Sequence, residues 1–344
     1  MNNPLALAGA MVLRLLLIGL VLTGAGAAAA ATLDDVKARG RLVCGVNQGL
    51  VGFGKQAGET WSGFDIDFCR AMAAALFRDD TKVDYIPLSA DERFEALRAG
   101  KIDLLSRNST WTLGREVTFG LTFAGVSYYD GQGFMVPRAA GILSALELKG
   151  KTVCVLKGTT NEANLPDYFN ANNMPYETIA ATNTAEAIAA YDSGKCNVLT
   201  SDVSQLYAWR LDLATPDENV ILPSTISKEP LGPVVRQDDP AWANLVKWVL
   251  FALINAEELG ISSQTIDAAL ASDKPAVRRF VGAESDFGAQ MGIADDWAVQ
   301  VIRSVGHYGE IYDRNLGVDS DLGIARGMNQ LWNRGGIQYA PPMR

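Results

Sequence analysis

The chain has 344 residues and a formal net charge of −9 at pH 7, from 30 Lys and Arg against 39 Asp and Glu. This charge argues against nucleic acid as a partner, because nucleic-acid binding depends on Lys and Arg side chains that neutralise phosphates. The length exceeds what one hydrophobic core usually serves and therefore predicts two lobes.

The first 31 residues have the composition of a secretory signal peptide. Arg14 precedes an apolar stretch at residues 15–22, which runs into a tract of small residues at 24–31. The stretch is shorter than the roughly 20 residues that span a membrane, and an A-x-A cleavage site lies close to Thr32. A retained N-terminal anchor is the alternative, because the alanines could extend the apolar core. We expect cleavage of residues 1–31 and export to the periplasm.

Two segments of the chain occur twice in the same order. GRLVC at residues 40–44 recurs as GKTVC at 150–154, and FEALRAGKIDLL at 94–105 recurs as AIAAYDSGKCNVL at 187–199. The first segment predicts the start of a strand, and the second predicts a helix closed by a glycine and followed by a buried strand. Such short strings also recur by chance, but the shared order and the shared element types favour an internal duplication.

Each half therefore alternates strands and helices, with further helices predicted over 65–77 and 160–169. This alternation predicts a mostly parallel sheet in each lobe, and sheets of this kind bind ligands beyond the carboxyl ends of their strands. Asn108 and Asp202 each come just after such a strand. Two facing lobes would place these strand ends around a shared cleft.

The four cysteines are Cys44, Cys69, Cys154 and Cys196. In an exported chain they predict two disulfides, and three pairings are possible. Pairing Cys44 with Cys154 or Cys196 would bridge the two lobes and prevent the cleft from opening. We therefore favour the pairs Cys44–Cys69 and Cys154–Cys196. The spacing is unlike that of a zinc site, and we expect no metal and no cofactor.

Several residues near the predicted strand ends match the two charges of a free amino acid. The Arg115 guanidinium can hold a carboxylate through two parallel hydrogen bonds. Gly158 and Thr160 open a predicted helix, whose N-terminal N–H groups and hydroxyls can meet an anion. Asp202 can accept from an ammonium group. The alternatives are a surface pair between Arg115 and Glu116, and a simple helix cap at the glycine.

Longer strings are more specific: GFDID at 63–67, LSRNSTWTLGR at 105–115, YYDGQGF at 128–134, GTT at 158–160, ISKEPLGP at 226–233, FALINAEEL at 251–259 and LWNRGGIQYAPP at 331–342. With these strings the chain resembles the extracytoplasmic amino-acid-binding proteins of ABC importers. Within that family it resembles the general L-amino-acid-binding subgroup of the family 3 solute-binding proteins. The resemblance covers nearly all of the chain after the leader.

The resemblance implies an α/β fold of the two-lobed periplasmic-binding-protein type II, with two hinge crossover strands. Lobe one would comprise residues 32–128 and 227–344, and lobe two residues 129–226. The segment 282–344 would be a helical extension of lobe one. The implied partners are an L-amino acid and the permease subunits of an ABC importer, with the protein itself a monomer.

The resemblance also implies roles for individual residues. Arg115 would clamp the α-carboxylate of the ligand, helped by Thr110 and Thr160. Asp202 and the backbone around Asn108 would hold the α-ammonium group. For Arg115 and Asp202 these are also the roles that their charges predict.

The chain departs from many relatives at two places. Leu50 stands where they have an aromatic lid, although Phe53 and Trp111 could still wall the pocket; for Phe53 a place in the core is an equal alternative. Arg107 stands where they have a small residue. A second guanidinium near Arg115 would favour Glu, Asp, Gln and Asn as ligands, and its alternative is a hinge or surface salt bridge.

A subunit that presents its bound ligand to a receptor instead of a permease is one alternative function, and an enzyme of related fold is another. A periplasmic dehydratase-like enzyme acting on an amino acid or a prephenate-like acid would need a general acid or base in the cleft. The single histidine, His307, lies outside every predicted strand end. We therefore expect a binding protein and no catalytic activity.

Overall fold

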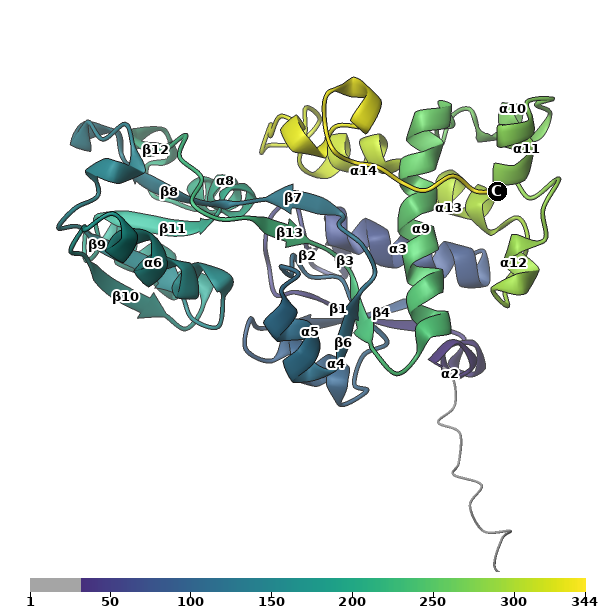
Figure 1. The fold of residues 1–344 in the computed structure, drawn as a ribbon, viewed down its shortest axis with the longest axis horizontal. Helices are drawn as coiled ribbons and strands as arrows, with labels where there is room; N and C mark the ends of the chain where they lie inside the picture. Colours follow the sequence, from purple (N-terminus) through teal and green to yellow (C-terminus); the bar gives the residue numbers. More distant parts are fainter. Residues whose placement is uncertain (1–31) are drawn as a thin grey trace, which may run out of the picture.

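The computed structural model describes residues 32–344, so the predicted signal peptide lies outside the described residues. Two bodies are visible in Figure 1, each with a five-stranded sheet, and a two-stranded ribbon joins them. The chain thus forms two lobes, as its length predicts.

The sheet of lobe one has the order β4-β1-β5-β14-β6. Strand β1 runs parallel to β4 and β5, whereas β14 runs antiparallel to β5 and β6. The bounds are β1 (Leu42–Asn47), β4 (Val83–Leu88), β5 (Leu104–Leu105), β6 (Leu121–Phe123) and β14 (Val234–Arg236).

The sheet of lobe two repeats this arrangement in the order β10-β9-β11-β8-β12. Strand β9 runs parallel to β10 and β11, and β8 runs antiparallel to β11 and β12. The repeated sequence segments supply β1 and β9, then β5 and β11, which occupy equivalent places in the two sheets. The bounds are β8 (Gln132–Pro137), β9 (Thr152–Leu156), β10 (Glu177–Ala181), β11 (Val198–Asp202) and β12 (Asn219–Ile221).

The helices cover the sheets, and the two predicted at residues 65–77 and 160–169 lie within one or two residues of their expected bounds. Lobe one carries α2 (Thr32–Arg39), α3 (Phe64–Phe77), α4 (Arg93–Arg98) and α5 (Leu113–Phe119), with a small hairpin of β2 (Lys55–Ala57) and β3 (Thr60–Ser62). Lobe two carries α6 (Thr160–Ala171), α7 (Thr184–Asp192) and α8 (Val203–Leu211).

The remaining helices follow the return of the chain to lobe one. They are α9 (Pro240–Leu259), α10 (Ile266–Leu270), α11 (Pro275–Phe280), α12 (Phe287–Gln290), α13 (Trp297–Val305) and α14 (Tyr308–Asn315). Helix α13 packs against α3 and α9, and α14 also packs against both. The predicted extension therefore lies on lobe one (Figure 1). From residue 32 onward, no helix is long and apolar enough to cross a membrane.

The local start of α3 depends on a glycine. Gly63 has a φ of 135°, a conformation that disfavours residues with a side chain. A Cβ atom at this position would also lie 2.1 Å from the carbonyl oxygen of Phe53. The backbone can therefore bring the loop at Phe53 against the first turn of α3 only because residue 63 is glycine.

The ribbon between the lobes consists of β7 (Tyr128–Asp130) and β13 (Glu229–Leu231), which pair antiparallel. The chain leaves lobe one along β7 into β8 and returns along β13 toward β14 (Figure 1). These are the two crossover strands that the resemblance implies. Rotation about such a short ribbon is how two-lobed proteins open and close a cleft.

Both disulfides lie within single lobes. Cys44 of β1 is bonded to Cys69 of α3, and Cys154 of β9 is bonded to Cys196, just before β11. The Cα–Cα distances are 6.3 Å and 5.7 Å. The favoured pairing is confirmed, and neither bond restrains the cleft.

Candidate binding site between the lobes

A polar pocket lies where the carboxyl ends of strands from both lobes face each other. Its lining residues come mainly from the segments that follow β4, β5, β9 and β11. Lobe one supplies Ala90, Arg93, Arg107, Asn108, Thr110 and Arg115, and lobe two supplies Leu156, Thr159, Thr160, Asn161, Asp202 and Gln205.

Side chains of the two lobes meet directly across this pocket. The hydroxyl oxygens of Thr110 and Thr160 are 3.4 Å apart, and the Asn108 amide donates to the Gln205 side-chain oxygen at 3.4 Å. The structure therefore represents a closed arrangement of the lobes, in which a bound molecule would contact both.

Arg115 lies in the first turn of α5, which Thr112 caps by accepting from the Arg115 backbone N–H. Its guanidinium donates to the Thr110 carbonyl oxygen at 2.7 Å and lies over the Phe94 ring. Burial lowers the pKa of Arg115, against the opposing influence of Glu229 and Asp202. Arg115 forms no ion pair with Glu116, which was the alternative role.

Asp202 is the last residue of β11 and is 5% exposed. Its Oδ1 accepts one hydrogen bond from Asn161, at 2.9 Å. Burial raises the pKa of Asp202 well above its ordinary value, and the nearby Asp130 and Glu229 raise it further. A cation bound beside Asp202 would favour the ionised carboxylate.

The loop that carries Asn108 is held by a buried carboxylate. Asp65 accepts from the Asn108 backbone N–H at 2.8 Å and from the Ser106 hydroxyl at 3.4 Å. Asn108 itself has a φ of 25°, and its side-chain oxygen accepts from Asn47 at 2.9 Å. Burial raises the pKa of Asp65 to about 6. These bonds fix the backbone of Asn108 at the edge of the pocket.

The Gly-Thr-Thr turn is both a helix cap and a wall of the pocket. Thr159 caps α6 by accepting from the Glu162 backbone N–H, and the N–H of Gly158 donates to the Glu162 side chain at 3.1 Å. Thr160 donates to Glu229 of the hinge strand β13 at 2.7 Å. Gly158 thus lies beside the pocket, whereas both threonines line it.

Arg107 is buried at the end of β5, where its Nε donates to the Leu88 carbonyl oxygen at 2.9 Å. Burial lowers the pKa of Arg107 to about 10, although Asp65 opposes this shift. Its terminal nitrogens form no hydrogen bond with residues 32–344. Arg107 also lines a second, more open hollow that continues from the pocket toward α7. The alternative role of Arg107 was a surface salt bridge, and Arg107 forms no salt bridge with residues 32–344.

The model of the bacterial extracellular solute-binding proteins, family 3, matches residues 42–265. The chain belongs to this family. The general L-amino acid-binding periplasmic protein AapJ of Rhizobium johnstonii is 55% identical over 324 residues, 93% of this chain and 95% of its own. The glutamate/glutamine/aspartate/asparagine-binding protein BztA of Rhodobacter capsulatus is 48% identical over 93% of this chain and 95% of its own.

Among solved structures, a periplasmic binding protein of an ABC transporter from Brucella ovis, with glutathione bound, is 53% identical. The match covers 92% of this chain and 100% of that one, with a TM-score of 0.90. This family 3 chain therefore has the two-lobed type II periplasmic-binding-protein fold.

Three residues considered at the pocket lie elsewhere in this family 3 protein. Leu50 and Phe53 are buried in the core, where Phe53 packs edge-on against Phe64 and Tyr128. Trp111 is 38% exposed and stacks on Phe123. Because side chains alternate along an extended segment, the inward direction of Thr110 turns Trp111 outward.

Four polar residues at or beside the pocket could not be identified from the sequence: Arg93, Asn161, Gln205 and Glu229. Arg93 is the first residue of α4 and immediately precedes the repeated segment, so its position gave no sign that it faces the cleft. Glu229 lies within the ISKEPLGP string, which was the one available signal for it.

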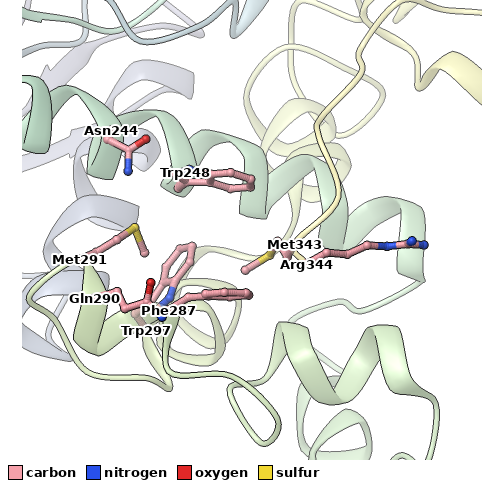
Figure 2. Close-up of a pocket in the computed structure, with 8 residues that line it drawn as sticks. All are labelled: Asn244, Trp248, Phe287, Gln290, Met291, Trp297, Met343 and Arg344. Atoms are coloured by element: carbon pink, nitrogen blue, oxygen red, sulfur yellow. The ribbon is translucent and has the colours of Figure 1, made fainter.

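A separate pocket lies in the C-terminal part of lobe one, between α9, α12, α13 and the chain end (Figure 2). Trp248, Phe287 and Trp297 line it together with Met291 and others. Its one charged lining residue is at the C-terminus and extends away from the aromatic rings (Figure 2). All its lining residues belong to lobe one, so a molecule bound in this pocket would not contact both lobes.

Proposed function

We propose that this protein captures an L-amino acid between its lobes and delivers it to the permease of an ABC importer. One observation carries the proposal: Arg115 and Asp202 belong to opposite lobes and line the same pocket, where Asp202 is buried and Arg115 is partly buried. Neither has an oppositely charged side chain within 4.0 Å among residues 32–344. Because an unpaired buried charge is costly, this arrangement favours a ligand that carries both charges.

The two ends of the ligand have different partners in this proposal. The α-carboxylate lies on Arg115, where the Thr110 hydroxyl donates an additional hydrogen bond. The Thr160 hydroxyl, which donates to Glu229 in this structure, turns its single proton to the ligand carboxylate. The α-ammonium group donates to Asp202 and to the backbone near Asn108. Since these partners come from both lobes, ligand contacts stabilise the closed state relative to the open one.

The ligand side chain extends toward Arg107. A guanidinium there donates to a carboxylate or to an amide oxygen, which favours Glu, Asp, Gln and Asn. The name of BztA supports this range, and that of AapJ supports a broader one. Glutathione, bound in the Brucella ovis structure, also has a free α-amino acid end on its γ-glutamyl residue.

The names of the relatives support delivery and location as well. AapJ is a periplasmic protein, and the Brucella ovis protein belongs to an ABC transporter. Together with the predicted signal peptide, they support export to the periplasm and a permease as partner. We propose a monomer with lobe one at residues 32–128 and 227–344, and lobe two at 129–226.

Catalysis is not part of the proposal. His307 lies in the extension of lobe one, where its Nδ1 accepts from the Glu310 backbone N–H and caps α14. Burial lowers the pKa of His307. A mass-spectrometric search for dehydrated product after incubation with prephenate or an amino acid tests the enzymatic alternative.

The binding proposal is tested by calorimetry with a panel of L-amino acids. Arg115→Met and Asp202→Asn should each abolish detectable binding, whereas Arg138→Met, a change at an exposed arginine of lobe two, should leave the dissociation constant unchanged. Circular dichroism checks that the variants are folded. Full affinity in a folded Arg115→Met variant would refute the proposed site.

A further inference from the structure

Arg93 is a buried cation that the proposed ligand contacts have not used. It is 3% exposed and lines the pocket. One terminal nitrogen donates to the Ala90 carbonyl oxygen, but its buried Nε has no hydrogen-bond partner in the described part of the chain. The guanidinium lies 4.5 Å from the centre of the Phe94 ring, and that of Arg115 lies 5.0 Å from the same centre. Arg93 and Arg115 therefore lie against the same aromatic ring, and each is close enough to influence the charge of the other.

Arg93, Arg107 and Arg115 bring three guanidinium groups into one pocket. No Asp or Glu oxygen of residues 32–344 lies within 4.0 Å of any of them. Burial lowers the pKa of Arg93 well below its ordinary value, and the two other arginines lower it further against Asp202 and Asp91. None of the three guanidinium groups therefore has an ion-pair partner in contact with it among these residues, although carboxylates lie farther away.

The position of Arg93 adds to this cost. It is the first residue of α4, where the partial positive charge of the helix N-terminus disfavours a cation. Burial of an unpaired charge is itself strongly unfavourable. A purely structural arginine would be expected to have its donors satisfied, as Arg326 does through Glu257 and the Asn329 carbonyl oxygen.

The ligand's α-groups leave this charge unbalanced. An α-carboxylate on Arg115 and an α-ammonium on Asp202 account for one guanidinium and one carboxylate. Arg93 and Arg107 then remain without an anion in direct contact. A second carboxylate at the end of the ligand side chain would satisfy the free donors of both.

We propose that Arg93 is a specificity-determining residue that, together with Arg107, binds a side-chain carboxylate of the ligand. The site accordingly prefers acidic amino acids to their amides. This inference rests on the proposed function and specifies its ligand class. An amide presents one acceptor oxygen and two N–H donors to the same pair of guanidiniums, so its NH₂ group faces donors with nothing to accept.

The test compares glutamate with glutamine by calorimetry on the unmodified protein and three variants. Arg93→Met should raise the dissociation constant for glutamate by about 10- to 100-fold, since a hydrogen bond to a charged group is lost, and that for glutamine much less. Arg98→Met is the matched control on the same helix, because Arg98 pairs with Glu95 at the surface, and it should change neither constant. Arg93→Lys should restore part of the preference for glutamate.

Equal losses for glutamate and glutamine in a folded Arg93→Met variant would overturn the inference, as would unchanged affinity for both. If this variant fails to fold, the unmodified protein still decides the matter, because tighter binding of glutamine than glutamate contradicts the inference. A failure of the proposed function gives a different result: the unmodified protein then binds no amino acid at all.

Discussion

The side-chain amide of Asn329 pairs with both backbone polar groups of Tyr129 on the hinge strand β7. Its oxygen accepts from the Tyr129 N–H at 2.7 Å, and its nitrogen donates to the Tyr129 carbonyl oxygen at 3.0 Å. Gln338 and the Tyr308 hydroxyl both donate to the carbonyl oxygen of Ser127, just before this strand. The segment beyond the matched family region thus holds one of the two strands that connect the lobes.

Replacing Asn329 by alanine should destabilise the protein by about 1–3 kcal/mol, because two backbone groups of Tyr129 lose their partners. The free energy of unfolding is measured by urea titration. Asn333→Ala is the control, since Asn333 is exposed in the same segment. Equal stability of the two variants would show that the Asn329–Tyr129 bonds contribute nothing measurable.

Ligand affinity should fall as the medium becomes acidic. The pKa of Asp202 is raised by burial and by its acidic neighbours Asp130 and Glu229, and only the ionised carboxylate accepts from an ammonium group. Affinity is therefore fully present above this raised pKa and is lost as the pH falls through it. Calorimetry with glutamate from about pH 8 to about pH 5 measures the effect. A dissociation constant that stays unchanged over this range would contradict the prediction.

Asp65 should make the free energy of unfolding fall as the pH rises, whereas ligand affinity should rise with pH. Its pKa is about 6 in the folded protein against an ordinary value of 3.8, so the folded state binds the proton more tightly. The stabilisation is complete below pH 3.8 and is lost as the pH rises to about 6, by up to about 3 kcal/mol.

Asp65→Asn tests this dependence, because asparagine keeps an acceptor for the Asn108 N–H and does not titrate. Urea unfolding at several pH values should show a smaller loss of stability with rising pH in the variant than in the unmodified protein. If the free energy of unfolding changes with pH equally in the two proteins, other groups cause the pH dependence. Asp130 is then a candidate, because its pKa is also raised to about 6.

Removal of the second disulfide should destabilise lobe two. Cys154 and Cys196 are 42 residues apart, and their bond limits the freedom of the unfolded loop between them. The double change Cys154→Ser and Cys196→Ser should lower the free energy of unfolding by about 3–4 kcal/mol in the chain-entropy model. Limited proteolysis should then cut lobe two first. Cleavage confined to lobe one would contradict this assignment.

The duplicated elements could be predicted from the sequence because their signals are local. The repeated segments at residues 94–105 and 187–199 carry their own apolar pattern and closing glycine, which indicate a helix and then a strand wherever they occur. Arg115 and Asp202 follow such strands, and the carboxyl ends of strands in open α/β sheets face ligands by geometry. The charges of these two residues then indicate the chemistry of the site.

Only the tertiary structure decided which other side chains reach the pocket. Arg93 precedes a repeated segment and has no local pattern that separates it from the exposed Arg98 five residues later. Trp111 belongs to a specific string yet turns outward, because Thr110 takes the inward position. Asn329 meets Tyr129 across 200 residues of chain. Such contacts depend on how distant elements pack, and packing is a property of the whole chain that no segment contains by itself.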